Sequence, residues 1–208
     1  MEFTLDRAQR LAFAAANRRA MLLLHRAASD YLGARCCLLN GVLSGLELGS
    51  QAIEKHLKAL LLFASPELNP KEFSHNIVRL SDRATRAGLV DLARHHETIQ
   101  KFYGHFQSRY PDNPGGSTSA STGELAALDG LIIDLIEALP VPIEIRLSSG
   151  VYGRLAFLTG NSAFPDAQLL LKRNPALLAK LPSIVNDRER LASLALQPPQ
   201  DSRAPLAD

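Results

Sequence analysis

The stretch Gln51-Ala-Ile-Glu-Lys-His-Leu-Lys-Ala-Leu-Leu-Leu-Phe63 decides the fold class of this chain. Its apolar residues recur at the spacing of one helix face: Ile53, Leu57, Leu60, Leu61 and, just beyond the stretch, Ala64. Glu54 and Lys58 stand four residues apart in the orientation that stabilises a helix. Pro66 and Pro70 follow, and neither has the backbone N–H that a continuing helix needs. The stretch therefore predicts an amphipathic helix that packs against a core.

Helical spacing continues on both sides of this stretch, from about residue 4 to residue 110, and returns over residues 125–139. Further helices are predicted over residues 4–24 or beyond, 28–43, 75–86, 99–110 and 125–139. Ser74 is the candidate N-cap of the 75–86 helix, and Gly88 suits its end. Residues 111–123 are rich in Pro, Gly, Ser and Thr and predict a loop. A mainly all-α fold follows, an up-and-down bundle of about five helices over residues 1–139.

The remaining residues predict a small C-terminal extension over residues 140–196. Alternating apolar residues over 143–147, a Ser-Ser-Gly turn and a second apolar stretch over 151–158 permit a short β-hairpin. Pro165-Asp166 and Asn174-Pro175 look like helix starts, because each pairs a capping residue with a proline. Short helices are therefore predicted over 166–173 and 175–181, with a last one from Ser183 to Leu196. Residues 197–208 are polar and proline-rich and predict a disordered tail.

Composition narrows the class of protein. Hydrophobic residues make up 46% of the 208 residues, and the mean hydropathy is −0.02, which is typical of a soluble globular protein. No apolar run is long enough to span a bilayer, and no secretory signal opens the chain, so we expect a cytoplasmic protein without a membrane partner. Cys36 and Cys37 are adjacent and predict two reduced thiols rather than a disulfide or a zinc site. No phosphate-binding glycine motif occurs, and no cofactor is expected.

Charge is distributed unevenly along the chain. Residues 1–113 hold 15 Lys and Arg against 11 Asp and Glu, whereas residues 114–208 hold 8 against 10. All six histidines also lie in the first part. A mildly basic, histidine-rich half is compatible with polyanion binding, but this excess is too small to predict it alone.

The helix predicted over residues 99–110 has two faces. Its apolar face consists of Ile99, Phe102, Tyr103, Phe106 and Tyr110. Basic residues at matching spacing lie on the opposite side: Arg94, Lys101, His105 and Arg109. These four residues and His75 are the candidate ligand-binding residues, because Arg holds phosphates and His changes charge near neutral pH. The alternatives are a solvated basic face that pairs with Glu54 or Glu97 and, for His75-Asn76, a structural helix start.

Several segments in this order resemble the HEPN family, a family of helical domains tied to nucleotide and RNA chemistry. The resemblance covers about residues 20–139 and depends on Tyr31, Ala34-Arg35, the helix from Ala52 to Leu60, His75-Asn76 and Arg109-Tyr-Pro111. It implies a helical bundle that forms a homodimer with a basic cleft between the protomers. The partners it implies are a nucleotide, RNA or a nucleotidyltransferase protein.

The residues that divide catalytic from inert members of this family are few. HEPN ribonucleases carry an Arg followed, after four to six residues, by a His in a metal-independent site, and no His follows Arg109 in this chain. The resemblance therefore implies a non-catalytic module that binds nucleotide, RNA or a partner protein as a homodimer. One alternative is a ribonuclease, the toxin of a toxin–antitoxin system or a defence effector, in which His105 and Arg109 form an altered catalytic site. The other is a structural scaffold for protein interactions.

Overall fold

A computed structural model describes residues 5–108, 122–159 and 169–195. Within these ranges the chain forms helices and no strands, which confirms the all-α prediction. The principal elements are α1 (Arg7–Ala16), α2 (Arg18–Leu39), α3 (Ser44–Ala64), η1 (Pro70–Phe73), α4 (Ile77–Arg86), η2 (Ala93–His95), α5 (His96–Ser108), α6 (Thr122–Glu137), α7 (Ile143–Ser148), α8 (Gly150–Thr159) and α10 (Pro175–Ala195).

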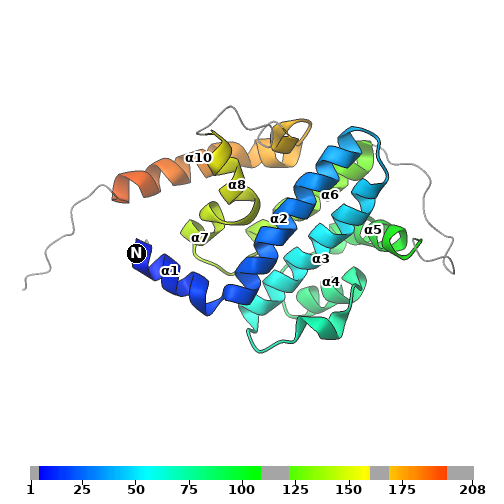
Figure 1. Cartoon of the computed structure of the whole chain (residues 1–208), viewed down its shortest axis with the longest axis horizontal. Coiled ribbons are helices and arrows are strands. Elements are labelled where there is room, and N and C mark those ends of the chain that lie inside the picture. The colour runs from blue at the N-terminus through cyan, green and yellow to red at the C-terminus, as the bar shows by residue number, and fades with distance from the viewer. Residues whose placement is uncertain (1–4, 109–121, 160–168, 196–208) are drawn as a thin grey trace, which may run out of the picture.

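The long helices α2 and α3 form the centre of the fold and lie side by side (Figure 1). α6 packs against both of them, and α4 and α5 cover α3. α8 contacts α2, while α10 contacts α6 and α7. In Figure 1, α4 and α5 lie on one side of the central pair, and α7, α8 and α10 lie on the other. The apolar stripe predicted for α3 is buried at Ile53, Leu57 and Leu60. Burial of such side chains supplies most of the stability of a helix in water.

Gly49 lets α3, α5 and α6 approach closely. A Cβ atom at this position would clash with the Phe102 ring on α5 and would lie 3.3 Å from Leu128 on α6. Phe102 and Leu128 are both buried, so neither side chain has free space to move into. The missing side chain of Gly49 is therefore what allows these three helices to meet.

The first helical segment breaks earlier than the sequence predicts. The prediction of one helix through Leu24 and another from Ala28 is wrong, because α1 ends at Ala16 and α2 runs unbroken from Arg18 to Leu39. Asn17 causes the break: its backbone N–H and its side-chain amide both donate to the Phe13 carbonyl, at 3.0 and 2.9 Å. Such local side-chain bonds compete with continued helix.

The predicted cap of the fourth helix is also wrong. Asn76, not Ser74, caps α4: its Oδ1 accepts a hydrogen bond from the Arg79 N–H at 3.0 Å. Ser74 instead has a positive φ of 51°, a conformation that is uncommon outside glycine. The predicted end of this helix near Gly88 is confirmed, since α4 ends at Arg86 and Gly88 has φ 67°.

The short β-hairpin predicted after residue 142 is wrong, because these residues form α7 and α8. Ile145 and Leu147 are buried although their spacing is that of a strand, and Glu144, directly before Ile145, is buried as well. A short helix enclosed on several sides buries residues at strand-like spacing, so its pattern imitates a strand. The serine hydroxyls support the helix, with Ser148 Oγ donating to the Glu144 carbonyl at 2.6 Å.

At the C-terminus one helix replaces two. The predicted start at Asn174-Pro175 is confirmed, because Asn174 Oδ1 accepts from the Leu177 N–H at 3.0 Å. The predicted stop at residue 181 is wrong, since α10 continues through Pro182 to Ala195. The predicted helix start at Pro165-Asp166 and the predicted tail over 197–208 lie outside the described residues.

A buried polar cluster ties the C-terminal helices to the centre of the fold. Arg35 on α2 forms an ion pair with Asp129 on α6, and both side chains are fully buried. Arg35 also donates to two carbonyls of the C-terminal segment, Leu169 at 2.9 Å and Lys172. Segments separated by more than a hundred residues are thereby joined at one guanidinium.

Tyr31 and Asn174 complete this cluster. The Tyr31 hydroxyl donates to Asp129 Oδ1 at 2.6 Å, and Asn174 Nδ2 donates to the Tyr31 oxygen at 3.0 Å. Burial, and then the charge of Asp129, raise the pKa of Tyr31 well above its usual value, so the hydroxyl keeps its proton. Burial also raises the pKa of Asp129, while the Arg35 hydrogen bond opposes that rise. The cluster is closed and internally paired, as buried polar groups generally are.

None of the described helices combines the length and the apolarity needed to cross a membrane.

Candidate functional site

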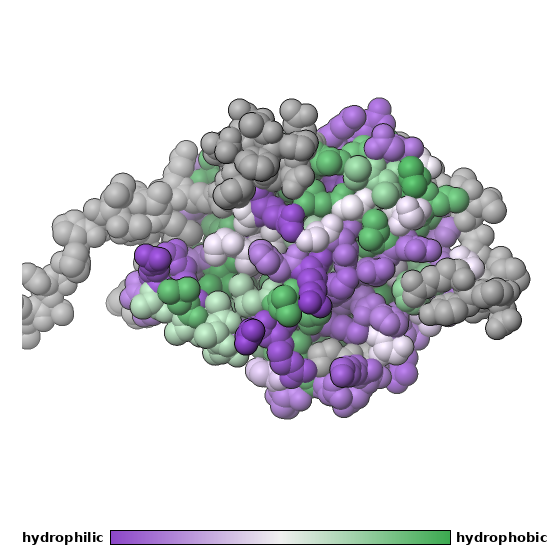
Figure 2. Space-filling model, in the orientation of Figure 1, coloured by the Kyte–Doolittle hydropathy of each residue, from purple (hydrophilic) through white to green (hydrophobic). Residues whose placement is uncertain are grey.

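A cleft of about 350 Å³ opens where the start of α4 faces the second half of α5. It is lined by Ser74, His75, Asn76 and Arg79 on one side and by Tyr103, Phe106 and Gln107 on the other. We call this the first cleft. Hydrophilic residues gather over α3 and α4 on the face drawn in Figure 2.

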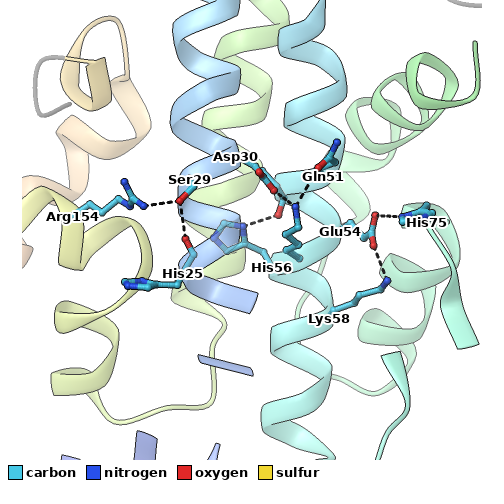
Figure 3. Close-up of polar contacts among 11 residues, drawn as sticks. His25, Ser29, Asp30, Gln51, Glu54, His56, Lys58, His75 and Arg154 are labelled. Carbon is cyan, nitrogen blue, oxygen red and sulfur yellow. Dashed lines mark hydrogen bonds and ion pairs between the residues drawn. The ribbon is translucent and has the colours of Figure 1, made fainter. Parts of the chain in front are cut away.

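Glu54 on α3 lies behind the first cleft and holds two basic side chains, Lys58 and His75, in place (Figure 3). Its Oε1 accepts a hydrogen bond from Lys58 Nζ at 2.6 Å, and its Oε2 lies 3.0 Å from His75 Nδ1. The Glu54 side chain is 9% exposed, whereas that of His75 is 61% exposed. A carboxylate behind one ring nitrogen fixes the orientation of an imidazole and leaves the other nitrogen for a ligand.

The backbone before α4 is held in an unusual conformation at the rim of the first cleft. Lys58 Nζ donates to the Ser74 carbonyl at 2.7 Å, at the residue whose φ is 51°. The His75 ring also packs on the Phe106 ring, with the centroids 5.4 Å apart. Lys58 therefore restrains Ser74, and the Phe106 ring restrains His75.

Arg79 is the permanent cation of the first cleft. Its side chain is exposed. Among the described residues, its guanidinium has no hydrogen-bond or ion-pair partner. Tyr103 faces it from α5 and is partly exposed. An unpaired guanidinium, an oriented imidazole and a tyrosine ring suit an anionic ligand with a planar group, because Arg binds phosphate and rings stack on aromatic side chains.

Two of the basic residues in the stripe predicted along the 99–110 helix form ion pairs with α6 instead of lining the first cleft. Lys101 forms an ion pair with Glu124 on α6, and Arg94 forms one with Asp134, also on α6. The acids that pair with this stripe are thus on α6 rather than Glu54 or Glu97. Arg109 lies outside the described residues. The structure therefore brings Lys101 and Arg94 to the α6 side of α5 and places His75 in the first cleft with Arg79.

The side chain of His105, on α5, is buried. It is 8% exposed, and its Nε2 has no hydrogen-bond partner among the described residues. Burial, helped by the charge of Lys101, lowers the pKa of His105. A shielded, neutral imidazole is a poor phosphate ligand, and the first cleft offers the more accessible histidine.

His95 and Asp134 form a second histidine–carboxylate pair, which joins two elements of the fold. His95 Nε2 lies 2.6 Å from Asp134 Oδ2, and His95 is 7% exposed. Burial alone would raise the pKa of Asp134, but hydrogen bonds from Arg94 and His95 lower it below its usual value. This pair fixes η2 to α6. In the described ranges no group of three His, Cys, Asp or Glu side chains is arranged to hold a metal ion.

Comparison of the chain with protein-family models, curated proteins and solved structures found no match. The geometry of the first cleft is therefore the basis of the functional interpretation. Arg79 was missed as a site residue in the sequence. Its position four residues after His75, within the helix predicted over 75–86, could have suggested it, although His75 itself precedes α4.

Proposed function

We propose that this chain is a non-catalytic helical module that binds the phosphate of a nucleotide or of RNA in the first cleft. The observation that carries the proposal is the position of the Arg79 guanidinium, which has no partner among the described residues, beside His75, whose ring is oriented by Glu54. The partly exposed Tyr103 ring adds a surface on which a base can stack. The resemblance to HEPN domains, with the homodimer and the nucleotidyltransferase partner that it implies, belongs to the same proposal.

Removal of the Arg79 guanidinium is expected to weaken binding of a nucleoside 5′-monophosphate and of single-stranded RNA by about tenfold or more. The reason is that a charge-assisted contact to phosphate contributes about 1.5 to 3 kcal/mol. Binding of a fluorescent nucleotide to the purified full chain, followed by anisotropy in low salt, measures the effect of Arg79→Ala. Affinity should also fall as salt is added, because phosphate contacts release counterions.

Arg7→Ala is the matched control, since Arg7 is an exposed arginine on α1, away from the first cleft. It removes the same charge and should leave affinity unchanged within twofold. Equal loss in both variants would assign binding to net charge alone. The absence of binding by the wild-type chain to any nucleotide or RNA would disprove the proposal.

A ribonuclease remains the second candidate, because the 3.0 Å contact between His75 and Glu54 is also the geometry of an oriented general base. The same RNA samples are therefore examined for cleavage after prolonged incubation without metal. We expect intact RNA. Cleavage that disappears in His75→Ala and persists in Arg7→Ala would replace the binding module with an enzyme.

We also expect a homodimer in solution. Leu11 on α1 and Leu22 on α2 are 63% and 50% exposed, and Val42 and Leu43 at the α2–α3 turn are 47% and 42% exposed. Large apolar side chains in such numbers favour burial between protomers. Light scattering at tens of micromolar protein should give twice the 22.6 kDa chain mass; a monomer at that concentration would contradict the expectation.

A further inference from the structure

A second cleft lies along the same pair of helices. It measures about 420 Å³ and is lined on α4 by Ser81, Asp82, Thr85 and Arg86, and on the facing side by Leu92, Ala93, His96 and Ile99. Leu92 and Ile99 are buried and form an apolar floor, whereas Arg86 and His96 are exposed. We call this the second cleft.

The two clefts follow one seam between α4 and α5. Arg79 and Arg86 are seven residues apart on α4, and His96 and Tyr103 are seven residues apart on α5. Seven residues are two turns of helix, so each pair lies on one face of its helix. Arg79 and Tyr103 line the first cleft, and Arg86 and His96 line the second. The same two helix faces therefore pass from one cleft to the other.

The spacing of the cations along this seam suits a chain of phosphates. Seven residues of helix advance by about 10 Å, which is about three steps of a stacked single strand at 3.4 Å per nucleotide. Each cleft combines one exposed arginine with aromatic or apolar surface, the combination that holds a sugar-phosphate backbone and its bases. A mononucleotide in the first cleft would leave Arg86 and His96 without a ligand.

One charge along the seam opposes an anion. Asp82 lies between Arg79 and Arg86 and lines the second cleft. The Arg86 Nε donates to the Asp82 backbone carbonyl at 3.2 Å rather than to its carboxylate. Glu54 behind the first cleft is already engaged by Lys58 and His75. Asp82 is thus the acid whose removal should strengthen anion binding.

We propose that the ligand of this seam is a stacked single-stranded nucleic acid that occupies both clefts at once, with phosphates at Arg79 and Arg86. The inference rests on the proposed function, because it extends the phosphate site of the first cleft into the second. It assigns the ligand by length and charge spacing rather than by base sequence, since base edges are not needed for either arginine contact.

Length dependence of binding tests this inference. A nucleoside 5′-monophosphate and unstructured oligoribonucleotides of two, four and eight nucleotides are titrated against the full chain by anisotropy or competition. Affinity should rise by about tenfold or more between one and four nucleotides and then level off, because the second cleft adds a phosphate contact and a stacking surface.

The variants separate the two clefts. Arg86→Ala should weaken the four- and eight-nucleotide ligands by about tenfold and leave the monophosphate within twofold. Arg79→Ala should weaken all of them, Arg7→Ala none, and Asp82→Asn should tighten the longer ligands. Arg86 is exposed, and circular dichroism of each variant checks that the fold is retained.

The outcomes distinguish the inference from the function on which it rests. Monophosphate binding that depends on Arg79, without any gain from length or any effect of Arg86→Ala, overturns the inference and leaves the proposed function standing. No binding of any nucleotide overturns both. Oligodeoxyribonucleotides of equal length distinguish DNA from RNA as the strand that is bound. Inorganic polyphosphate that binds as tightly and responds to the same variants would overturn the assignment to nucleic acid.

Discussion

Replacement of Arg35 by methionine (Arg35→Met) is expected to lower the free energy of unfolding by about 3 to 5 kcal/mol. The guanidinium is the charged partner of Asp129, and both side chains are fully buried. Without it the Asp129 carboxylate stays in the core with the Tyr31 hydroxyl as its remaining recorded partner. The carbonyls of Leu169 and Lys172 also lose a donor, and each unsatisfied group adds to the cost.

Urea unfolding followed by circular dichroism measures this loss, and a double-mutant cycle tests its cause. The Arg35→Met, Asp129→Leu double variant should be more stable than Arg35→Met alone, because it removes the uncompensated charge. Tyr31→Phe serves as a milder variant and should cost about 1 to 2 kcal/mol. A loss below about 1 kcal/mol in Arg35→Met would contradict the role given to this cluster.

Replacement of His56 by leucine is expected to remove a large part of the acid sensitivity of the fold. His56 on α3 is fully buried; its Nδ1 lies 2.8 Å from the Ala52 carbonyl, and its Nε2 has no partner among the described residues. Burial lowers the pKa of His56 to about 4. The folded protein therefore keeps this imidazole neutral while the unfolded chain, with a pKa of about 6.5, takes up a proton.

Acid should destabilise the fold through His56, because the unfolded chain binds a proton that the folded protein excludes. The stability contributed by neutral His56 is fully present above about pH 6.5 and is lost as the pH falls toward 4, by about 3 kcal/mol in all. Unfolding free energies of wild type and His56→Leu at pH 7, 6, 5 and 4 should diverge by this amount as the pH falls. The wild-type minus variant difference cancels the carboxylates that titrate in both. Parallel curves would show that His56 has no part in acid unfolding.

Much of the fold was predictable from the sequence, because the apolar spacing and the capping residues of a helix lie within a few consecutive turns. The α3 stripe and the Asn174-Pro175 helix start are short-range features, and both are confirmed. The break at Asn17 was missed because Ala, Leu and Arg on both sides favour one continuous helix, and a single side-chain bond to Phe13 decided otherwise. Alternation at 143–147 was misleading because enclosure by neighbouring helices, not strand pairing, buries those residues.

The surroundings of the candidate residues were less accessible to sequence analysis. Lys101 and Glu124 are 23 residues apart, and no local rule connects residues at that separation. The buried pair of Arg35 and Asp129 spans 94 residues. A partial signal did exist, since Arg35 shares a helix face with Tyr31 and Leu38, and Asp129 follows Leu128 in an apolar helix. A lone charge on an apolar face predicts a buried partner without saying which one.

The Arg35 cluster also bears on how the chain is completed during synthesis. Translation adds about 5 to 20 residues per second, so on the order of ten seconds pass between the appearance of Arg35 and that of Asn174. Until Asp129 has been made, α2 and α3 can pair through their apolar faces, but the guanidinium has neither its carboxylate nor its carbonyl acceptors. The nascent hairpin thus keeps one hydrated, charged position on its inner face. Release of the last third of the chain from the ribosome is what allows that position to close.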